Sequence, residues 1–328
     1  MNRSKPAASA LPSLRQLQYL TALAERRNFR HAADACFVTQ STLSAGIKEL
    51  EATLGTRLVE RSTRAMRLTP AGAEVVARAR AIIAAAEDLA NFAKGVREPF
   101  SGPLRLGVIP TIAPFLLPPV LAALRARYPA LKPFLREDLT ANLLERLRGG
   151  SLDFALIALP YETGELDVRA LFKDPFWFVA RADDPLAASK SISVRQLRPE
   201  HVLLLEEGHC LRDHAIRACG PREGRGNMLQ ATSLTTLLQM VEGGLGVTLL
   251  PEMTLKSGIL TGTRLIARPF ATEVPSRTIA LAMRREANLH REAGLFAEHV
   301  LQCLRAQQKR ALNRGRSRAR SPTARSRA

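Results

Sequence analysis

Within residues 14–54, apolar residues recur three and four positions apart, which predicts three short helices with one buried face each. A tight turn at 38–41 separates the second helix from the third, and polar residues open the third. This layout is typical of a helix-turn-helix, and a plain three-helix domain is the alternative. The apolar positions along the three helices are Leu14, Leu17, Leu20 and Leu23; Ala32, Ala33 and Cys36; and Leu43, Ile47, Leu50 and Leu54.

Residues 57–69 form two short extended runs around a basic tip, which predicts a wing or, alternatively, a solvated basic hairpin. From Pro70, where a first-turn proline is tolerated, a helical pattern runs to about Val96. Its apolar positions alternate four and three apart for three heptads, so we expect a partner helix and hence a dimer. A helix folded onto its own domain could show the same stripe. The seam consists of Val75, Ala79, Ile82, Ala86, Leu89, Ala93 and Val96.

The rest of the chain, beyond a linker at 101–103, alternates strands with helices, which predicts a parallel sheet covered by helices and two α/β lobes with a cleft between them. In the first lobe we expect strands at 104–109, 132–135 and 152–159 and helices at 115–127 and 141–147. In the second we expect strands at 176–180, 202–205, 228–231 and 247–250 and a helix at 234–241. Ligands in such folds sit outside the carboxyl ends of strands, where Thr111 and Thr140 offer hydroxyls, although either may be a helix cap.

Composition supports a globular chain. The 328 residues are 46% hydrophobic, enough for two or three domains, and 20 Gly and 20 Pro exclude a collagen-like or wholly disordered chain. No apolar run approaches the ~18 to 20 residues of a membrane span, and a charge interrupts the place of a signal peptide. We therefore expect a cytoplasmic protein without membrane contact.

Charge is concentrated at the end of the chain. The formal net charge is +18, and residues 305–328 hold nine basic and no acidic side chains. This tail lacks the apolar content of a folded segment, so we expect it to be disordered, as we do residues 1–12. Loose attraction to phosphate and a dispensable solvated terminus are equally open for it.

The N-terminal motifs resemble the DNA-binding domain of LysR-type transcriptional regulators. The matching pieces are FRHAAD at 29–34, TQSTLS at 39–44, IKELE at 47–51, LG at 54–55 and LTPAG at 68–72, with Arg61 and Arg64. The resemblance implies an α/β plus all-α protein: a winged helix-turn-helix at 13–69, a linker dimerisation helix at 70–100 and a two-lobed, periplasmic-binding-protein-like regulatory domain at 101–304. It also implies assembly as a homodimer and homotetramer on double-stranded promoter DNA, with RNA polymerase as a further partner.

Within that family, the regulatory half resembles the hydrogen-peroxide-sensing OxyR branch. The matching pieces are GVIPT at 107–111, LLP at 116–118, Glu137 with Thr140, GHCLRD at 208–213, Cys219, ATSL at 231–234, TLLP at 248–251 and RTI at 277–279. The segment GHCLRD, followed by a cysteine nine positions after its own, distinguishes this branch. It implies a regulator of the oxidative stress response, acting as activator or repressor.

Four cysteines in a reducing compartment do not predict a structural disulfide framework, and no zinc spacing is present, so we expect no metal and no cofactor. Cys36 and Cys303 lie on apolar helix faces and are expected to be small buried hydrophobes. Cys210 stands where a strand gives way to a helix, between His209 and Arg212, a setting that can lower a thiol pKa. On this ground alone the cysteine would still be inert more often than not.

If residues 210–219 are helical, the Cα atoms of Cys210 and Cys219 lie ~13 Å apart, beyond the limit of about 7 Å for a disulfide. A bond between them would require the helix to unwind. The resemblance implies that peroxide oxidises Cys210 to a sulfenic acid and that Cys219 then condenses with it. It also implies a surrounding site formed by Thr111, Thr140, His209, Asp213 and Arg277.

For DNA, side chains at the start of the third helix can enter a major groove and read bases: Gln40, Ser41, Thr42 and Ser44. Lys48, Arg61 and Arg64 suit phosphate contacts, and Arg64 could instead enter a minor groove. We also expect contacts from Arg15 and Thr39.

Two alternative functions remain open. The first is a regulator whose cleft holds a small metabolite, with the cysteines as bystanders. The second is a thiol peroxidase, although an enzyme needs neither a helix-turn-helix nor a heptad helix.

Overall fold

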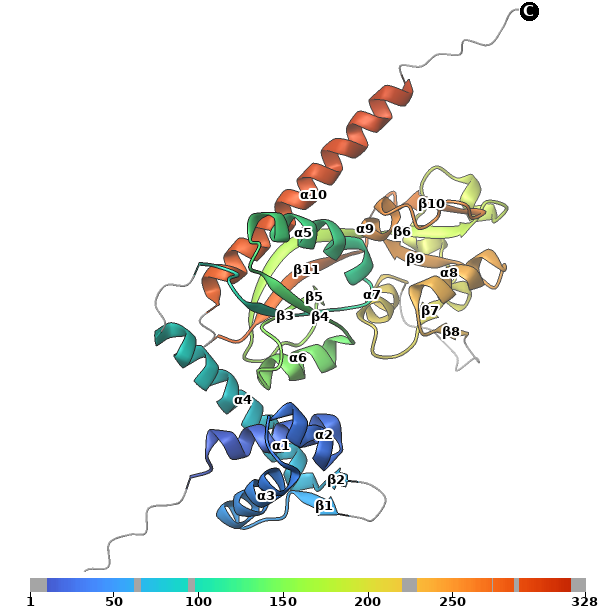
Figure 1. Ribbon diagram of the computed structural model, residues 1–328. Coiled ribbons are helices and arrows are strands. Elements are labelled where there is room, and N and C mark those ends of the chain that lie inside the picture. The colour runs from blue at the N-terminus through green and yellow to red at the C-terminus, as the bar shows by residue number, and fades with distance from the viewer. Residues whose placement is uncertain are drawn as a thin grey trace, which may run out of the picture. The chain divides into compact units, whose positions relative to one another are not determined.

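The computed structural model describes residues 11–61, 66–93, 98–219, 229–272, 274–285 and 289–319 (Figure 1). It consists of two compact units, each described by itself below. The first holds residues Met1–Arg97 with Arg146–Ser151, and the second holds Glu98–Glu145 with Leu152–Ala328.

The first unit begins with three helices, α1 (Leu14–Arg26), α2 (Phe29–Ala35) and α3 (Gln40–Leu54), so the predicted helices are confirmed. Each has a side-chain N-cap. Ser13 forms a reciprocal capping box with Gln16, Asn28 accepts two backbone N–H groups, and Thr39 accepts one. The buried faces meet in one apolar core formed by Leu17, Leu20, Leu23, Ala32, Ala33, Leu43, Ile47 and Leu50.

The wing is an antiparallel pair of strands, β1 (Val59–Arg61) and β2 (Met66–Leu68), which confirms the two extended runs. Its base is tied to α3, because the Glu51 carboxylate accepts the backbone N–H groups of Leu58 (2.8 Å) and Val59 (3.1 Å). The tip of the wing with Arg64, and the side chain of Arg61, lie outside the described part of the chain.

Helix α4 (Pro70–Ala93) carries the predicted seam in two parts. Of the seam residues in its first turns, Ala79 is buried in the core of the first unit, and Val75 is half-buried against that core beside the buried Val76. Farther along, Ile82 and Leu89 remain 48% and 67% exposed. Large apolar side chains held in water favour a partner surface, so the dimer stays a prediction for the later part of the seam only.

The second unit contains the predicted βαβαβ run, except for the last three residues of α6, which are counted with the first unit: β3 (Pro103–Val108), α5 (Ala113–Arg127), β4 (Lys132–Glu137), α6 (Thr140–Arg148) and β5 (Phe154–Leu159). Strand β3 pairs in parallel with both β4 and β5, which confirms the parallel sheet. Figure 1 shows α5 on one side of these strands and α6 on the other.

Four further strands join this sheet in antiparallel fashion: β6 (Asp167–Arg181), β9 (Thr248–Pro251), β10 (Leu265–Pro269) and β11 (Ser276–Met283). The path runs β10-β6-β11-β5-β3-β4, and β9 also pairs with β6. The first half of β6 pairs with β11, whereas its second half pairs with β9 and β10, so one strand runs through both lobes. The sequence prediction covered only 176–180 of β6 and contained neither β10 nor β11.

The second lobe adds short elements around an apolar core that includes Phe176, Phe178 and Leu238. They are η1 (Pro185–Ala188), η2 (Val194–Gln196), η3 (Pro199–His201), β7 (Leu204–Leu205), α7 (Cys210–Cys219), β8 (Gln230–Ala231), α8 (Leu234–Glu242) and α9 (Glu252–Lys256). Strands β7 and β8 pair in parallel, and α7 follows directly from β7.

The last helix corrects one prediction. Helix α10 (His290–Ala319) packs beside α5 and continues through residues 305–319, which we expected to be disordered. Ala, Gln, Leu, Lys and Arg are good helix formers, and extending an existing helix avoids the cost of a new nucleus. Residues 320–328 lie outside the described chain.

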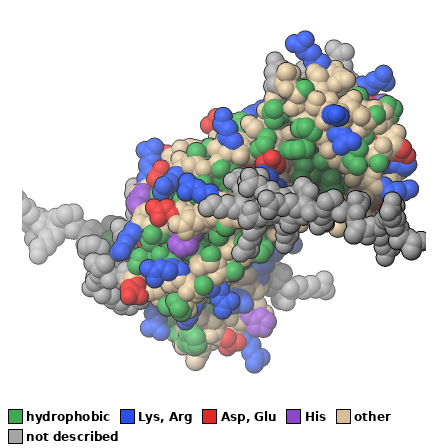
Figure 2. Space-filling view, turned by 90° about the horizontal axis from the view of Figure 1, so that it is seen from above, with side chains coloured by type: hydrophobic (Ala, Val, Ile, Leu, Met, Phe, Trp, Pro, Cys, Tyr) green, Lys and Arg blue, Asp and Glu red, His purple; other side chains and the backbone are tan. Residues whose placement is uncertain are grey.

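Lys and Arg side chains are spread over the face seen in Figure 2. Within the described residues, no helix is long and apolar enough to cross a membrane.

Candidate functional site

Cys210 is the first residue of α7 and is a free thiol, 5% exposed. The turn before it depends on Gly208, whose φ of +93° is a conformation that L side chains rarely adopt. A Cβ at Gly208 would also lie 2.9 Å from Cδ1 of Leu139. The loop that carries Cys210 therefore packs closely against the residue before α6.

Thr140, the first residue of α6, touches the thiol. Its Oγ1 lies 2.6 Å from Sγ of Cys210, and either atom can donate the hydrogen bond. Both side chains are buried. The structure thus brings together two residues 70 positions apart that the resemblance assigned to one site.

Burial raises the pKa of the Cys210 thiol above its ordinary value. The Thr140 hydrogen bond and the positive charge of Arg277 act to lower this pKa but do not outweigh the burial, and Asp213 raises it further. The expectation of a lowered thiol pKa is therefore wrong for this conformation. The cation that acts on the sulfur is Arg277 and not the neighbouring His209 or Arg212, and the loss of solvent around the sulfur could not be seen in the sequence.

Arg277 in β11 is fully buried and organises the polar side of the site. Its Nη1 donates to Thr111 Oγ1 (2.7 Å) and its Nη2 to the Thr111 carbonyl (3.1 Å). Its Nε donates to Asp174 Oδ2 (3.1 Å), and the other oxygen of that carboxylate accepts the backbone N–H of Met253 (3.0 Å). Thr111 is thus held by a guanidinium. Asp174 was missed, because nothing in the local sequence of β6 marks it as the partner of a residue 103 positions away.

Two histidines flank the thiol along the chain. Burial lowers the pKa of His209, with Glu206 opposing this effect, so the ring is biased toward its neutral form. His214, which sequence reasoning also missed, is 5% exposed in the next turn of α7, and its ring faces Phe176 at 6.3 Å. Among the described residues, neither ring nitrogen has a partner within hydrogen-bond distance and geometry, although the Pro160 backbone acts on the ring and raises its pKa. Asp213, by contrast, is exposed.

Cys219 is the last residue of α7, so the predicted helix between the two cysteines is confirmed. Nine helical rises separate the Cα atoms by about 13 Å, which excludes a disulfide without unwinding. The side chain of Cys219 lies outside the described part of the structure.

On α3, the residues expected to read bases are presented at its N-terminal end. Gln40, Ser41 and Thr42 are exposed, as is Lys48, whereas Ser44 is half-buried. Thr39 has a local role: its hydroxyl caps the helix and bonds to the hydroxyls of Ser41 (2.9 Å) and Thr42 (2.8 Å). In α1, Arg15 donates to the hydroxyl of Tyr19 (2.8 Å).

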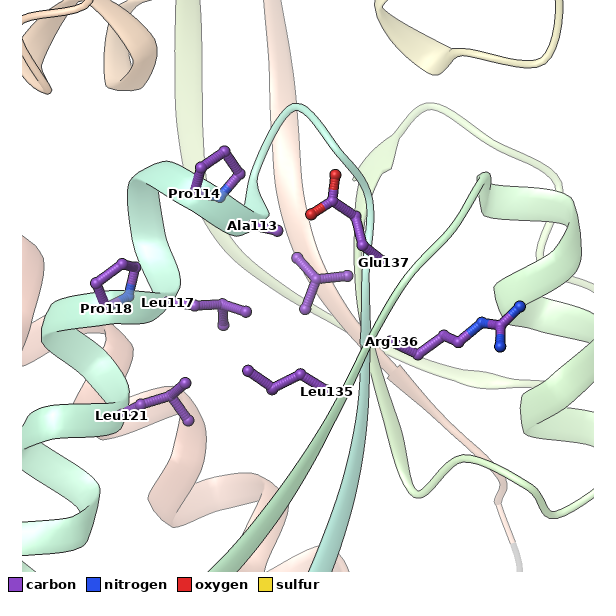
Figure 3. A pocket seen from close by; sticks show the side chains of 9 residues that line it. Ala113, Pro114, Leu117, Pro118, Leu121, Leu135, Arg136 and Glu137 are labelled. Atoms are coloured by element: carbon purple, nitrogen blue, oxygen red, sulfur yellow. The ribbon is translucent and has the colours of Figure 1, made fainter. Parts of the chain in front are cut away.

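A separate pocket of about 260 Å³ lies between α5 and β4 (Figure 3). Its wall is mainly apolar, and Arg136 points away from it in the close-up. No residue around Cys210 contributes to this pocket. The residues that line it are Val108, Ala113, Pro114, Leu117, Pro118, Leu121, Leu135, Arg136 and Glu137.

Comparison with known families agrees with this architecture. Residues 14–73 match the family described as bacterial regulatory helix-turn-helix protein, lysR family, and residues 97–305 match the LysR substrate binding domain. A DNA-binding helix-turn-helix joined to this regulatory domain defines a class of bacterial transcription regulators. The chain belongs to the LysR family.

Among similar proteins, the transcriptional regulator EstR of Acinetobacter baylyi is 44% identical over 87% of this chain and 94% of its own. A probable hydrogen peroxide-inducible genes activator of Streptomyces viridosporus is 42% identical over 84% and 89%. The solved structure of a full-length OxyR variant from Pseudomonas aeruginosa is similar with a TM-score of 0.77 at 35% identity, covering 89% of this chain and 95% of that one. An H2O2-bound OxyR mutant of Corynebacterium glutamicum matches with a TM-score of 0.62 at 33% identity over 93% and 98%.

Proposed function

We propose that the protein is a transcription regulator of the oxidative stress response that senses hydrogen peroxide through Cys210. The observation that carries this proposal is the buried thiol in hydrogen-bond contact with Thr140 and within the field of Arg277. The hydrogen peroxide-inducible activators and OxyR structures among its relatives support the same reading.

The chemistry proceeds in two balanced steps. The Cys210 thiol gives up its proton, and the resulting thiolate attacks one oxygen of peroxide. The O–O bond breaks, so Cys210 becomes a sulfenic acid and the other oxygen departs as hydroxide. This hydroxide combines with the proton from the thiol to form water. The Cys219 thiol then displaces the sulfenic hydroxyl as a second water and forms a disulfide. Peroxide is the two-electron oxidant, so no cofactor or metal is needed.

The raised thiol pKa has a role in this scheme. At neutral pH the buried thiol is mostly protonated, which protects it from unselective oxidation, because the thiolate is the reactive form. Hydrogen peroxide is a small neutral oxidant, and we propose that Thr140 and Arg277 stabilise the negative charge that develops on sulfur and oxygen when it reacts. Thr111, held by Arg277, and His209 complete the polar surroundings.

Oxidation becomes a change of shape because α7 has to unwind before Cys219 can reach Cys210. We propose that this rearrangement alters how the protein, as a dimer or tetramer, holds promoter DNA and RNA polymerase in the cytoplasm. It works as a stoichiometric switch and not as an enzyme that turns over peroxide.

The second candidate is a LysR-type regulator controlled by a small organic ligand, with the cysteines as bystanders. The 44% sequence identity to EstR over most of both chains supports this second candidate. The two candidates differ in what Cys210 does.

The deciding experiment treats reduced protein with about one equivalent of hydrogen peroxide and maps the cysteines by peptide mass spectrometry. We expect a Cys210–Cys219 link within minutes, with Cys36 and Cys303 still free, and loss of the peroxide response on an operator in the Cys210→Ser variant. If Cys210 stays a thiol, or the variant responds normally, peroxide sensing is refuted and a search for a ligand follows. Sustained consumption of peroxide with a reductant would indicate a thiol peroxidase instead.

A further inference from the structure

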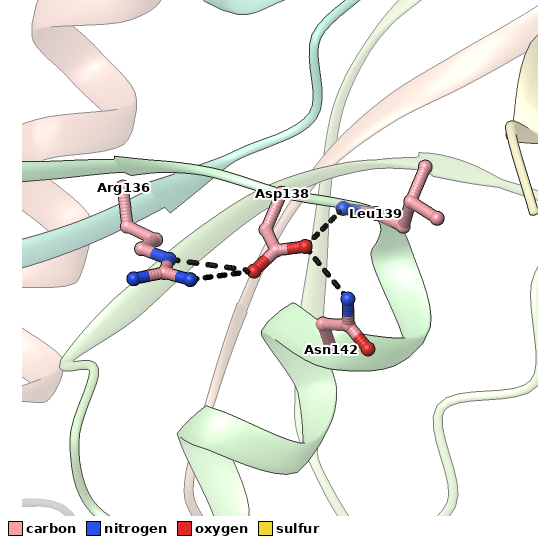
Figure 4. A network of polar contacts seen from close by, with 4 residues as sticks. All are labelled: Arg136, Asp138, Leu139 and Asn142. Atoms are coloured by element: carbon pink, nitrogen blue, oxygen red, sulfur yellow. Dashed lines mark hydrogen bonds and ion pairs between the residues drawn. The ribbon is translucent and has the colours of Figure 1, made fainter. Parts of the chain in front are cut away.

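The turn between β4 and α6 carries a network that sequence analysis did not single out (Figure 4). Asp138 stands at its centre, two residues before Thr140. One carboxylate oxygen, Oδ1, accepts the backbone N–H of Leu139 (3.0 Å) and the Asn142 side-chain amide (2.7 Å). The other, Oδ2, accepts Nε (3.3 Å) and Nη2 (3.2 Å) of Arg136.

This network spans the whole turn. Arg136 belongs to β4 and Asn142 to the first turn of α6, so one carboxylate ties the end of the strand to the start of the helix. The backbone N–H of Asp138 also donates to the carbonyl of Val108 in β3 (3.3 Å), which holds the turn on the sheet. The direction in which α6 leaves the sheet is therefore determined by groups around Asp138.

The carboxylate is suited to this task. Its side chain is 16% exposed, whereas that of Arg136 is 51% exposed. Burial raises the pKa of Asp138, but the hydrogen bonds from Asn142, Leu139 and Arg136 outweigh it and hold this pKa below its ordinary value. Asp138 is consequently ionised at neutral pH, and the contacts to it are charge-assisted.

Both residues that follow Asp138 contact the loop of the reactive cysteine. Leu139 packs so closely on Gly208 that a Cβ there would lie 2.9 Å from Cδ1 of Leu139. Thr140 makes the 2.6 Å contact to the sulfur. Since Thr140 follows Asp138 by two residues, any displacement or rotation of this turn changes the distance and direction of the Thr140 hydroxyl relative to the sulfur.

We infer that Asp138, clamped between Arg136 and Asn142, is a positioning residue that holds the Thr140 hydroxyl on Cys210 and thereby sets the rate at which the thiol reacts with peroxide. This inference rests on the proposed function. Asp138 does not contact peroxide in this proposal, because its effect on the thiol is transmitted by Thr140.

The test compares reduced full-length variants by two readouts: the second-order rate of Cys210 oxidation by hydrogen peroxide, and the pH profile of Cys210 alkylation by iodoacetamide. Thr140→Val should slow oxidation on the order of tenfold and shift the alkylation profile upward, because a hydrogen bond to the charged sulfur is lost. Asp138→Ala should shift both in the same direction by a smaller factor, about threefold or more. Asp138→Asn keeps the acceptor for Leu139 and should recover part of the loss.

A double variant tests the route of the effect. If Asp138 acts through Thr140, adding Asp138→Ala to Thr140→Val changes neither readout further. Asp183→Ala is the matched control. Like Asp138, Asp183 is a carboxylate of the second unit paired with an arginine two residues earlier, Arg181. Its removal should change neither the oxidation rate nor the alkylation profile of Cys210. Should Asp138→Ala fail to fold, Arg136→Gln alters the exposed end of the network and should still slow oxidation.

Three results would overturn the inference: Asp138→Ala or Arg136→Gln reacting like the wild type, a double variant slowed by the full product of both single effects, or a control as slow as Asp138→Ala. In each case wild-type Cys210 still reacts with peroxide, and the proposed function stands. If wild-type Cys210 does not react at all, the proposed function fails first and this inference falls with it.

Discussion

His214 should make the reduced regulatory unit sensitive to acid. It lies one turn after Cys210 in α7 and is buried against Phe176. Burial, and then the positive charge of Arg277, lower the pKa of His214 from 6.5 to about 4; Arg217 adds to this, while the Pro160 backbone and Asp213 oppose it. The folded state thus holds the ring neutral well below the pH at which an unfolded chain would protonate it.

The sign follows from which state binds the proton first. As pH falls below 6.5, the unfolded chain takes up a proton at His214 and the folded protein does not, so the free energy of unfolding decreases until about pH 4 and then levels off. A difference of about 2.5 pKa units at 1.36 kcal/mol each amounts to about 3 kcal/mol over this interval. Above pH 6.5 the group contributes no pH dependence.

The perturbation is His214→Gln, which keeps a polar side chain but cannot take up a proton in this range. Urea unfolding of the reduced protein can be followed by the fluorescence of Trp177, the one tryptophan in the chain, which lies in β6 of the same unit. Protein concentration is kept constant because an oligomer's stability depends on it. The difference between variant and wild type at each pH cancels the titration of all other groups.

We expect the variant to lose less stability than the wild type between pH 6.5 and pH 4, by up to about 3 kcal/mol. His201→Gln replaces an exposed histidine of the same unit and should follow the wild-type curve. Parallel curves for wild type and His214→Gln would show that the ring gains a proton in the folded state as readily as in the unfolded one, and would refute the reasoning.

Two further predictions concern a buried charge and the DNA surface. Asp174→Ala leaves the Arg277 guanidinium buried without its counter-charge, so urea unfolding of the second unit should show a loss of about 3–5 kcal/mol, and a loss below 1 kcal/mol would mean that water replaces the carboxylate. Lys48→Ala removes an exposed cation of α3; if it contacts phosphate, the slope of log K against log salt should fall by about 0.9 on operator and unrelated DNA alike, whereas an unchanged slope would remove Lys48 from the interface.

Local pattern was sufficient for much of the fold. The three helices of the first unit follow from apolar residues every three or four positions, because one side of a helix has to be buried whatever its neighbour is. The parallel strands β3, β4 and β5 follow in the same way from short apolar runs that alternate with helical segments. The antiparallel strands β10 and β11 could not be predicted from local pattern. A short apolar run such as that of β11 is equally typical of a buried helix until its partner strand is known.

The residues of the site could likewise be predicted only in part from the sequence. The resemblance of the motifs to the OxyR branch gave Cys210, Cys219, Thr140, Thr111 and Arg277 as candidates, and the helix between the cysteines was correctly expected. The structure shows how four of these residues meet, with the side chain of Cys219 outside the described part. It also adds groups that no motif contained: the Asp174 carboxylate, the buried His214 ring and the clamp at Asp138.

The sequence by itself therefore determined which elements form and which residue types are available for chemistry, because helix period, capping and strand alternation depend on neighbours within a few positions. Only the tertiary structure decided the electrostatics of the sulfur. Burial and charges arise from segments 70 or more positions apart, such as α6 against α7 and β11 against β6, and desolvation depends on all atoms around a group. For that reason the thiol pKa is raised where local sequence suggested that it would be lowered.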